Sequence, residues 1–230
     1  MYGFREIKAS KSTLARRKLI LGCGINDADY ITQPMVGGKQ LFCPYYAKWY
    51  SMLSRCYSKK YHNKFPTYIE CSVINDWLTF SNFKDWVEKQ DWENKHLDKD
   101  LLCQGNKVYG PDTCLFVEKE INLLLHDHKA KRGACRQGVH FSTRDKKFIA
   151  QINIYCKRTH LGCFNTEDEA YSAYKLAKYA HIKEVALEHT EPLRSALLKY
   201  TIDFNRKDVS NEGINSVEQS KLLQKYRNKQ

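Results

Sequence analysis

Apolar residues at helical spacing dominate the chain between residues 46 and 87. A first group recurs at intervals of three and four residues and predicts an amphipathic helix that ends near Ser58. Its members are Tyr46, Trp49, Tyr50, Leu53, Cys56 and Tyr57. A second group predicts one or two further helices, with Ser81 as a candidate N-cap. It consists of Val73, Trp77, Phe80, Phe83, Trp86 and Val87. Because each group fits one buried face, we interpret these side chains as core.

The pattern changes after residue 97 and predicts a ββα unit. The runs 97–102 and 114–117 are typical of two short strands. Between them lie the turn residues Gly105, Asn106, Gly110 and Pro111. A helix is expected over 118–128, with its apolar residues facing inward.

Alternation of apolar and polar residues predicts three short strands between residues 139 and 164. The runs are 139–141, 148–154 and 158–164, and turn residues separate them, which favours an antiparallel meander. Thr166 and Glu169 then form the pattern of a capping box at the start of a helix. That helix carries a stripe of small residues, which lets its backbone approach a sheet closely. The stripe is Ala170, Ala173, Ala177 and Ala180.

These elements predict an α+β fold in which a helical and ββα module precedes a three-stranded antiparallel sheet packed on one helix. The expected domains are a flexible basic N-terminal arm at 1–20, the module at 21–130 and the sheet domain at 131–190. A C-terminal helix and a polar tail are expected at 191–230. The tail has the pattern of a further helix near 217–226.

The composition is typical of a folded protein. Hydrophobic residues make up 42% of the 230 residues, which is enough for a core. No apolar run approaches the roughly 18 residues of a membrane span, and no signal peptide is recognisable. We therefore expect a cytoplasmic protein with no membrane partner.

The nine cysteines argue against a disulfide framework. Their number is odd and no CxxC pair occurs, so a ribbon-type zinc site is also disfavoured. Most of these thiols are expected in the core. A scattered site of two cysteines and two histidines stays open as an alternative.

Positive charge is concentrated in one short stretch of the chain. The formal net charge is +12. Residues 46–130 contain 12 basic and 12 acidic residues, whereas residues 131–164 contain eight basic residues and only Asp145 as an acidic one. Residues 1–45 add seven basic and three acidic residues. A charge that served solubility alone would not need this concentration, but a phosphate-binding face would.

The segment 138–180 resembles the plant APETALA2/ethylene-response-factor DNA-binding domain. The resemblance lies in Gly138-Val139, in Phe148 to Ile152, in His160 to Phe164 and in the stretch from Thr166 to Tyr174. It implies a three-stranded sheet in the major groove of double-stranded DNA, backed by a helix. That agrees with the charge count and with the strand pattern.

The polar residues of this segment are the candidate DNA-binding residues. Because strand side chains alternate, Val139, Phe141 and Phe148 are expected to face the helix while their polar neighbours face outward. Glutamine and asparagine can pair with adenine, arginine can pair with guanine, and basic residues in turns can contact phosphates. The candidates are His140, Ser142, Arg144, Lys146, Lys147, Gln151, Asn153, Lys157, Arg158 and His160.

The region 22–186 resembles phage and bacterial HNH-type homing endonucleases that carry an APETALA2-type domain. The matching stretches include residues 22–30, 43–46, 97–100 and 109–114. The resemblance implies a protein of phage or mobile-element type, acting in a bacterial host cell in association with the nucleoid.

The HNH motif itself is altered in this chain. An active site of this type needs a histidine base and a metal held by histidine, aspartate or asparagine. Here Lys99 stands in the place of the histidine and Cys114 in the place of the middle asparagine, while Asn122 matches the last asparagine. The candidate catalytic residues are Asp98, Lys99, Asp100 and Asn122, and Asp98 and Asp100 are the candidate metal ligands. Mg²⁺ is expected as a cofactor only if this module is active.

Three hypotheses follow from the sequence. The first is a DNA-binding protein that reads DNA with the sheet and whose HNH-like module is inactive or altered. The second is a metal-dependent DNA endonuclease that uses the altered site. The third is a factor that binds a host protein through its aromatic middle module and is tethered to nucleic acid by the sheet.

Overall fold

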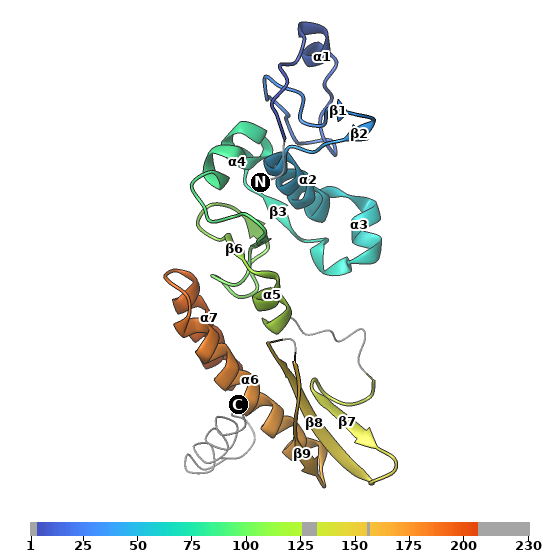
Figure 1. Cartoon of the computed structure of the whole chain (residues 1–230), viewed down its shortest axis with the longest axis vertical. Helices are drawn as coiled ribbons and strands as arrows, with labels where there is room; N and C mark the ends of the chain where they lie inside the picture. The colour runs from blue at the N-terminus through green and yellow to red at the C-terminus, as the bar shows by residue number, and fades with distance from the viewer. Residues whose placement is uncertain (1–3, 126–132, 156, 207–230) are drawn as a thin grey trace. The chain divides into compact units, whose positions relative to one another are not determined.

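The computed structural model describes residues 4–125, 133–155 and 157–206 of the chain. Its elements confirm a mixed α+β fold with one three-stranded antiparallel sheet (Figure 1). The chain divides into two compact units, with the boundary between Lys119 and Glu120. In the described ranges, no helix has both the length and the apolar character needed to cross a membrane.

The first unit consists of short helices and paired short strands. Its helices are α1 (Lys11–Ala15), α2 (Pro44–Tyr57), α3 (Lys59–Lys64) and α4 (Phe80–Val87), with 3-10 turns at Pro66–Tyr68 and Asn75–Leu78. Its antiparallel pairs are β1 (Met35–Val36) with β2 (Lys39–Gln40), and β4 (His96–Asp98) with β6 (Leu115–Val117). A parallel pair joins β3 (Ser72–Val73) to β5 (Val108–Tyr109). Helix α5 (Lys119–Leu125) follows β6, as expected, but the first strand ends at Asp98 instead of residue 102, and β5 lies between β4 and β6 in the chain.

Aromatic side chains form the core of the first unit, as their spacing predicted, although Tyr50 of the first group is 44% exposed. Trp49 and Phe83 are fully buried, and Trp77 and Phe80 are each only 1% exposed. The indole nitrogen of Trp49 is satisfied because it donates a hydrogen bond to the Trp77 carbonyl oxygen at 2.7 Å. Most of the aromatic residues on which the protein-partner hypothesis rested are therefore packing residues.

The N-terminal segment is bound to the first unit, which corrects the expectation of a flexible arm. The Ala9 amide donates to the Asp29 carbonyl oxygen at 2.9 Å. The Arg17 guanidinium donates to the carbonyl oxygens of Ala28 and Tyr30. Backbone carbonyl oxygens thus bind the Arg17 guanidinium within the first unit.

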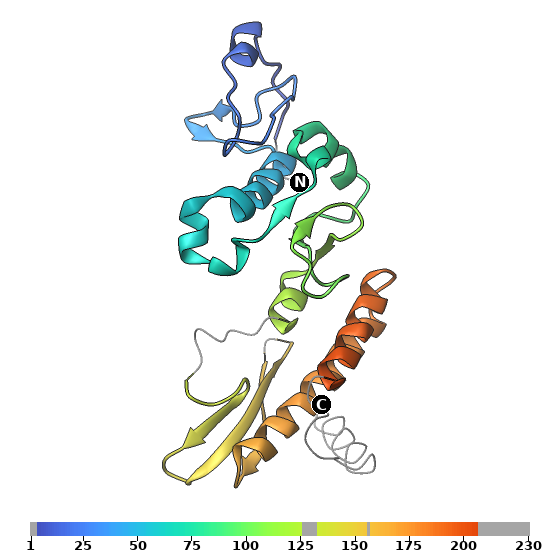
Figure 2. The same ribbon diagram turned by 180° about the vertical axis from the view of Figure 1, so that it is seen from behind.

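The second unit contains the three-stranded sheet and the two helices that follow it (Figure 2). Strands β7 (Val139–Ser142), β8 (Lys147–Ile154) and β9 (Lys157–Phe164) form an antiparallel meander, as predicted. Helix α6 (Glu167–Leu187) contacts all three strands, and α7 (Leu193–Arg206) packs against α6. The expected helix after Pro192 is therefore present, whereas the tail at 207–230 lies outside the described residues.

The boundaries of the second unit differ from those expected. The division falls near residue 119 instead of 130, and α7 belongs with the sheet domain. One contact shows why: the Tyr200 hydroxyl on α7 donates to the Leu125 carbonyl oxygen on α5 at 3.1 Å.

Small residues bring α6 close to the sheet. The capping box is present, because the Thr166 hydroxyl accepts from the Glu169 amide at 3.2 Å and the Glu169 carboxylate accepts from the Thr166 amide. Ala170, Ala173 and Ala177 are buried against the sheet together with its inward residues. Phe141 has the inward register but is 46% exposed, and its ring lies 5.1 Å from that of Phe148.

A β-bulge divides β9 into two halves. Ala150 pairs with Gly162 and Gln151 pairs with His160, so Leu161 is the additional residue. Leu161 is buried, whereas His160 on one side of it faces outward with Arg158. The bulge therefore lets a core residue and the outward polar residues share one strand.

Gly138 occupies a position that no other residue fits. Its φ of 75° lies in the left-handed region, and its carbonyl oxygen accepts a hydrogen bond from the Gln151 amide at 2.8 Å. A Cβ atom at this position would overlap the ring of Tyr174 on α6. The glycine thus allows the start of β7 to lie directly against the helix.

We expect Gly138→Ala to destabilise the second unit. The left-handed backbone alone costs about 1–2 kcal/mol for a residue with a side chain, and displacement of Tyr174 adds to this. Thermal unfolding followed by circular dichroism should show a melting temperature lowered by several degrees. Gly133→Ala is the matched control, since a Cβ there meets nothing within 4 Å. Equal stability of the two variants would contradict the close contact described here.

Candidate nucleic-acid interface

The face of the sheet opposite α6 brings together seven of the ten candidate DNA-binding residues. Alternation and the strand register place them on this outward face in directly opposed pairs. Ser142 lies opposite Lys147, Gln151 opposite His160, and Asn153 opposite Arg158. His140 lies opposite Ile149, which is itself opposite Cys163 on the other side. His140, Asn153, Arg158 and His160 are exposed, so the polar side chains are accessible to a ligand.

The outward face has a one-sided charge. The three strands contain no aspartate or glutamate, whereas Lys147 and Arg158 on the outward face are basic. The nearest acidic residue along the chain, Asp145, accepts a hydrogen bond from the Ser142 hydroxyl at 2.8 Å. A polyanion that approaches this face therefore meets cationic and neutral groups on the strands.

The other three candidates lie outside the outward face. Arg144 and Lys146 lie in the β7–β8 turn, where the Arg144 side chain is 94% exposed. Lys157 is not a turn residue: it begins β9 and pairs with Ile154, on the same side of the sheet as α6. Lys157 is exposed, but it points away from the outward row.

Sequence reasoning missed two residues of this face, Ile149 and Cys163. Both were passed over because only polar side chains were considered, although alternation with Phe148 and Ala150 already places Ile149 outward. Cys163 is exposed, and its sulfur lies 3.8 Å from Nε2 of His160.

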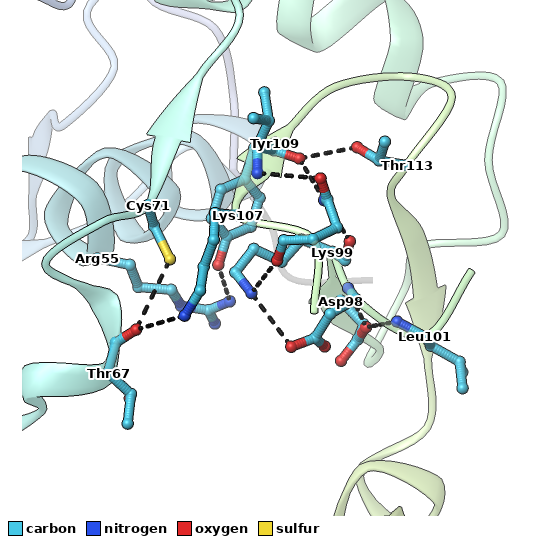
Figure 3. Close-up of polar contacts among 12 residues, drawn as sticks. Arg55, Thr67, Cys71, Asp98, Lys99, Leu101, Lys107, Tyr109 and Thr113 are labelled. Carbon is cyan, nitrogen blue, oxygen red and sulfur yellow. Dashed lines mark hydrogen bonds and ion pairs between the residues drawn. The ribbon is translucent and has the colours of Figure 1, made fainter. Parts of the chain in front are cut away.

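The segment that resembles the HNH motif forms a network of hydrogen bonds (Figure 3). Asp98 ends β4, and its Oδ1 atom accepts from the amides of Asp100 and Leu101 at 3.0 and 2.8 Å. The carboxylate therefore holds the turn that follows the strand. Burial raises the pKa of Asp98 above its ordinary value, and the nearby charge of Asp100 raises it further, although the two amides oppose this.

Lys99 points into the same network as a donor. Its side chain is buried, and Nζ donates to Oδ2 of Asp100 at 3.2 Å and to the Asn106 carbonyl oxygen at 2.9 Å. The Asn106 amide donates in turn to the carbonyl oxygens of Lys99 and Val108, each at 2.7 Å. These bonds tie the loop after β4 to the start of β5, so Lys99 helps to hold the backbone of this loop.

The other positions that resemble the HNH motif are partly or fully buried. Asn122 is half-buried on α5. Cys114 is buried, and burial raises the pKa of its thiol to about 11, which disfavours the thiolate. Among the described residues, no group of three histidine, cysteine or acidic side chains is arranged to hold a metal ion. The Mg²⁺ prediction therefore stays a prediction that rests on Asp98 and Asp100 alone.

Asp98→Asn is expected to stabilise the first unit at neutral pH. The raised pKa means that the folded state binds the Asp98 proton more tightly than the unfolded state, so this carboxyl lowers stability as the pH rises toward that pKa. An asparagine Oδ1 can accept from both amides without carrying the charge. Melting temperatures should therefore be higher for the variant near pH 7, and the gain should disappear as the pH falls through the raised pKa of Asp98 toward about pH 4.

Two controls decide how this result is interpreted. Asp112→Asn changes an exposed carboxyl in the same unit and should leave the melting temperature nearly unchanged. Millimolar Mg²⁺ should stabilise the wild type and not Asp98→Asn if Asp98 holds a metal ion. A loss of stability in Asp98→Asn at pH 7 without Mg²⁺ would show that the charge itself is needed.

Comparisons of the chain with protein-family models, with curated proteins and with solved structures found no match.

Proposed function

We propose that this protein binds double-stranded DNA through the outward face of the β7–β8–β9 sheet. The observation that carries the proposal is the accessible row of amide, imidazole and basic side chains on strands that contain no acidic residue. Helix α6 occupies the opposite face, so these side chains have no packing role to explain them.

The dimensions of the sheet support a duplex as the ligand. Neighbouring strands lie about 4.8 Å apart, so three strands have a width of about 10 Å, close to the roughly 12 Å of the major groove of B-form DNA. The major groove of A-form RNA is deep and narrow and does not admit such a sheet. The resemblance to the APETALA2-type domain supports the same mode of binding.

Each part of the face has a chemical role in this proposal. Gln151 and Asn153 on the central strand can form hydrogen bonds with base edges through their side-chain amides. Arg158, on the neighbouring strand β9, lies opposite Asn153 and can pair with guanine. Arg144 and Lys146 in the exposed turn are placed to contact phosphates. The basic residues concentrated in 131–164 supply most of the electrostatic attraction between this unit and the phosphate backbone of DNA.

The second hypothesis, a metal-dependent endonuclease, receives less support from the first unit. Both Asp98 and Lys99 are engaged in contacts that hold the backbone. Nicking of a supercoiled plasmid in Mg²⁺ or Mn²⁺ that is lost in Asp98→Asn would establish this activity in place of simple binding. The third hypothesis would be favoured if residues 46–130 contributed a binding surface for one host protein.

DNA affinity is expected to depend strongly on salt. Four to six phosphate contacts predict a slope of roughly −4 to −5 for the logarithm of the binding constant against the logarithm of salt concentration. Fluorescence anisotropy with a labelled duplex from 50 to 200 mM salt measures this slope. The double variant Gln151→Ala and Arg158→Ala should lose about ten-fold or more in affinity for its preferred duplex.

The matched control removes a positive charge elsewhere in the same unit. Lys183 is exposed on α6, on the opposite side of the sheet, and Lys183→Ala should retain nearly all of the affinity. A flat salt dependence, or equal losses in the double variant and in Lys183→Ala, would rule out the outward face as the binding surface.

A further inference from the structure

One apolar side chain lies at the centre of the outward face. Ile149 is on the central strand β8, with His140 directly opposite on β7 and Cys163 directly opposite on β9. It is half-buried, but it is not among the residues that pack in the core between the sheet and α6. Its partial burial therefore comes from its neighbours on the outward side.

The residues that follow Ile149 on the same strand give it a chemical context. Gln151 and Asn153 continue the outward row at every second position. Outward residues on one strand are about 6.7 Å apart, which corresponds to about two base-pair steps of 3.4 Å. The three side chains thus span about four steps along the duplex, and two of the three are amides.

The aliphatic side chain of Ile149 and the amide side chains of Gln151 and Asn153 both match A·T base pairs in the major groove. The 5-methyl group of thymine is the apolar group at the base edges there, and an aliphatic side chain contacts it favourably. Glutamine and asparagine can form two hydrogen bonds with the N6 and N7 atoms of adenine. The guanine-reading residue of the strands, Arg158, lies at one side of the row, on an edge strand.

We propose that the outward face selects an A·T-rich duplex, with Ile149 packed against the methyl group of a thymine and Gln151 and Asn153 paired with adenines. This inference rests on the proposed DNA binding and names the sequence class that the same face recognises. An apolar residue at this position excludes water from the methyl group of thymine. At a cytosine it offers no hydrogen-bond acceptor to the groove-facing N–H of the N4 amine, which is then left without a partner on the protein.

The test is a comparison of thymine with deoxyuridine, which lacks only the 5-methyl group. The full chain first selects its preferred duplex from a random pool, and each thymine is then replaced singly by deoxyuridine. At one thymine, the wild type should lose about three- to five-fold in affinity, as expected for one buried methyl group. Selected sequences should be A·T-rich over at least four consecutive base pairs.

Ile149→Ala links this loss to one side chain. The variant should bind the thymine duplex more weakly and should no longer distinguish it from the deoxyuridine duplex at that position. Leu187→Ala removes an exposed leucine from α6 and should keep the full discrimination of the wild type. Should Ile149→Ala fail to fold, Ile149→Val, which is shorter by one methylene, takes its place and should lose part of the discrimination.

The outcomes separate this inference from the proposed function. Absence of salt-dependent binding to any duplex overturns both. Selection of G·C-rich sequences, or deoxyuridine tolerated at every position by the wild type, overturns the A·T inference and leaves DNA binding intact. Equal discrimination by the wild type and Ile149→Ala overturns the assignment to Ile149.

Discussion

The close contact between α6 and one face of the sheet determines how the second unit is used. The alanine stripe and Gly138 let the helix lie directly on the strands, so every inward residue of the central strand has a packing partner. Because successive side chains of a strand point to opposite faces of the sheet, packing of the inward residues against α6 leaves the outward residues facing solvent. The accessible polar face is thus a direct consequence of the packing on the opposite side.

The features that the sequence predicted well depend on residues close together in the chain. The spacing of apolar residues predicted α2, and the observed helix ends at Tyr57, next to Ser58. Thr166 and Glu169 predicted the capping box, and alternation predicted the meander of β7, β8 and β9. In each case the signal and the structure lie within one element or one turn.

The features that the sequence did not reveal depend on distant partners. At the N-terminus of α4, the Ser81 amide donates to the Asp27 carboxylate at 2.9 Å, and Thr79, not Ser81, is the N-cap residue. The contacts of Arg17 with backbone carbonyl oxygens and of Lys99 with Asn106 likewise join residues that only the folded chain brings together. The bulge at Leu161 depends on how β9 pairs with β8, and the alternation of residues within β9 alone does not predict that pairing.

The separation of inward and outward residues has an evolutionary consequence. Exposed outward residues such as Asn153, Arg158 and His160 take no part in the core, and substitutions at such positions typically change stability by no more than about 0.5 kcal/mol. A lineage that carries this sheet can therefore change the chemistry of the outward face by point substitution while the fold is retained. Inward residues such as Ala150, which is fully buried, lack that freedom, so divergence should accumulate on alternate residues of the same strand.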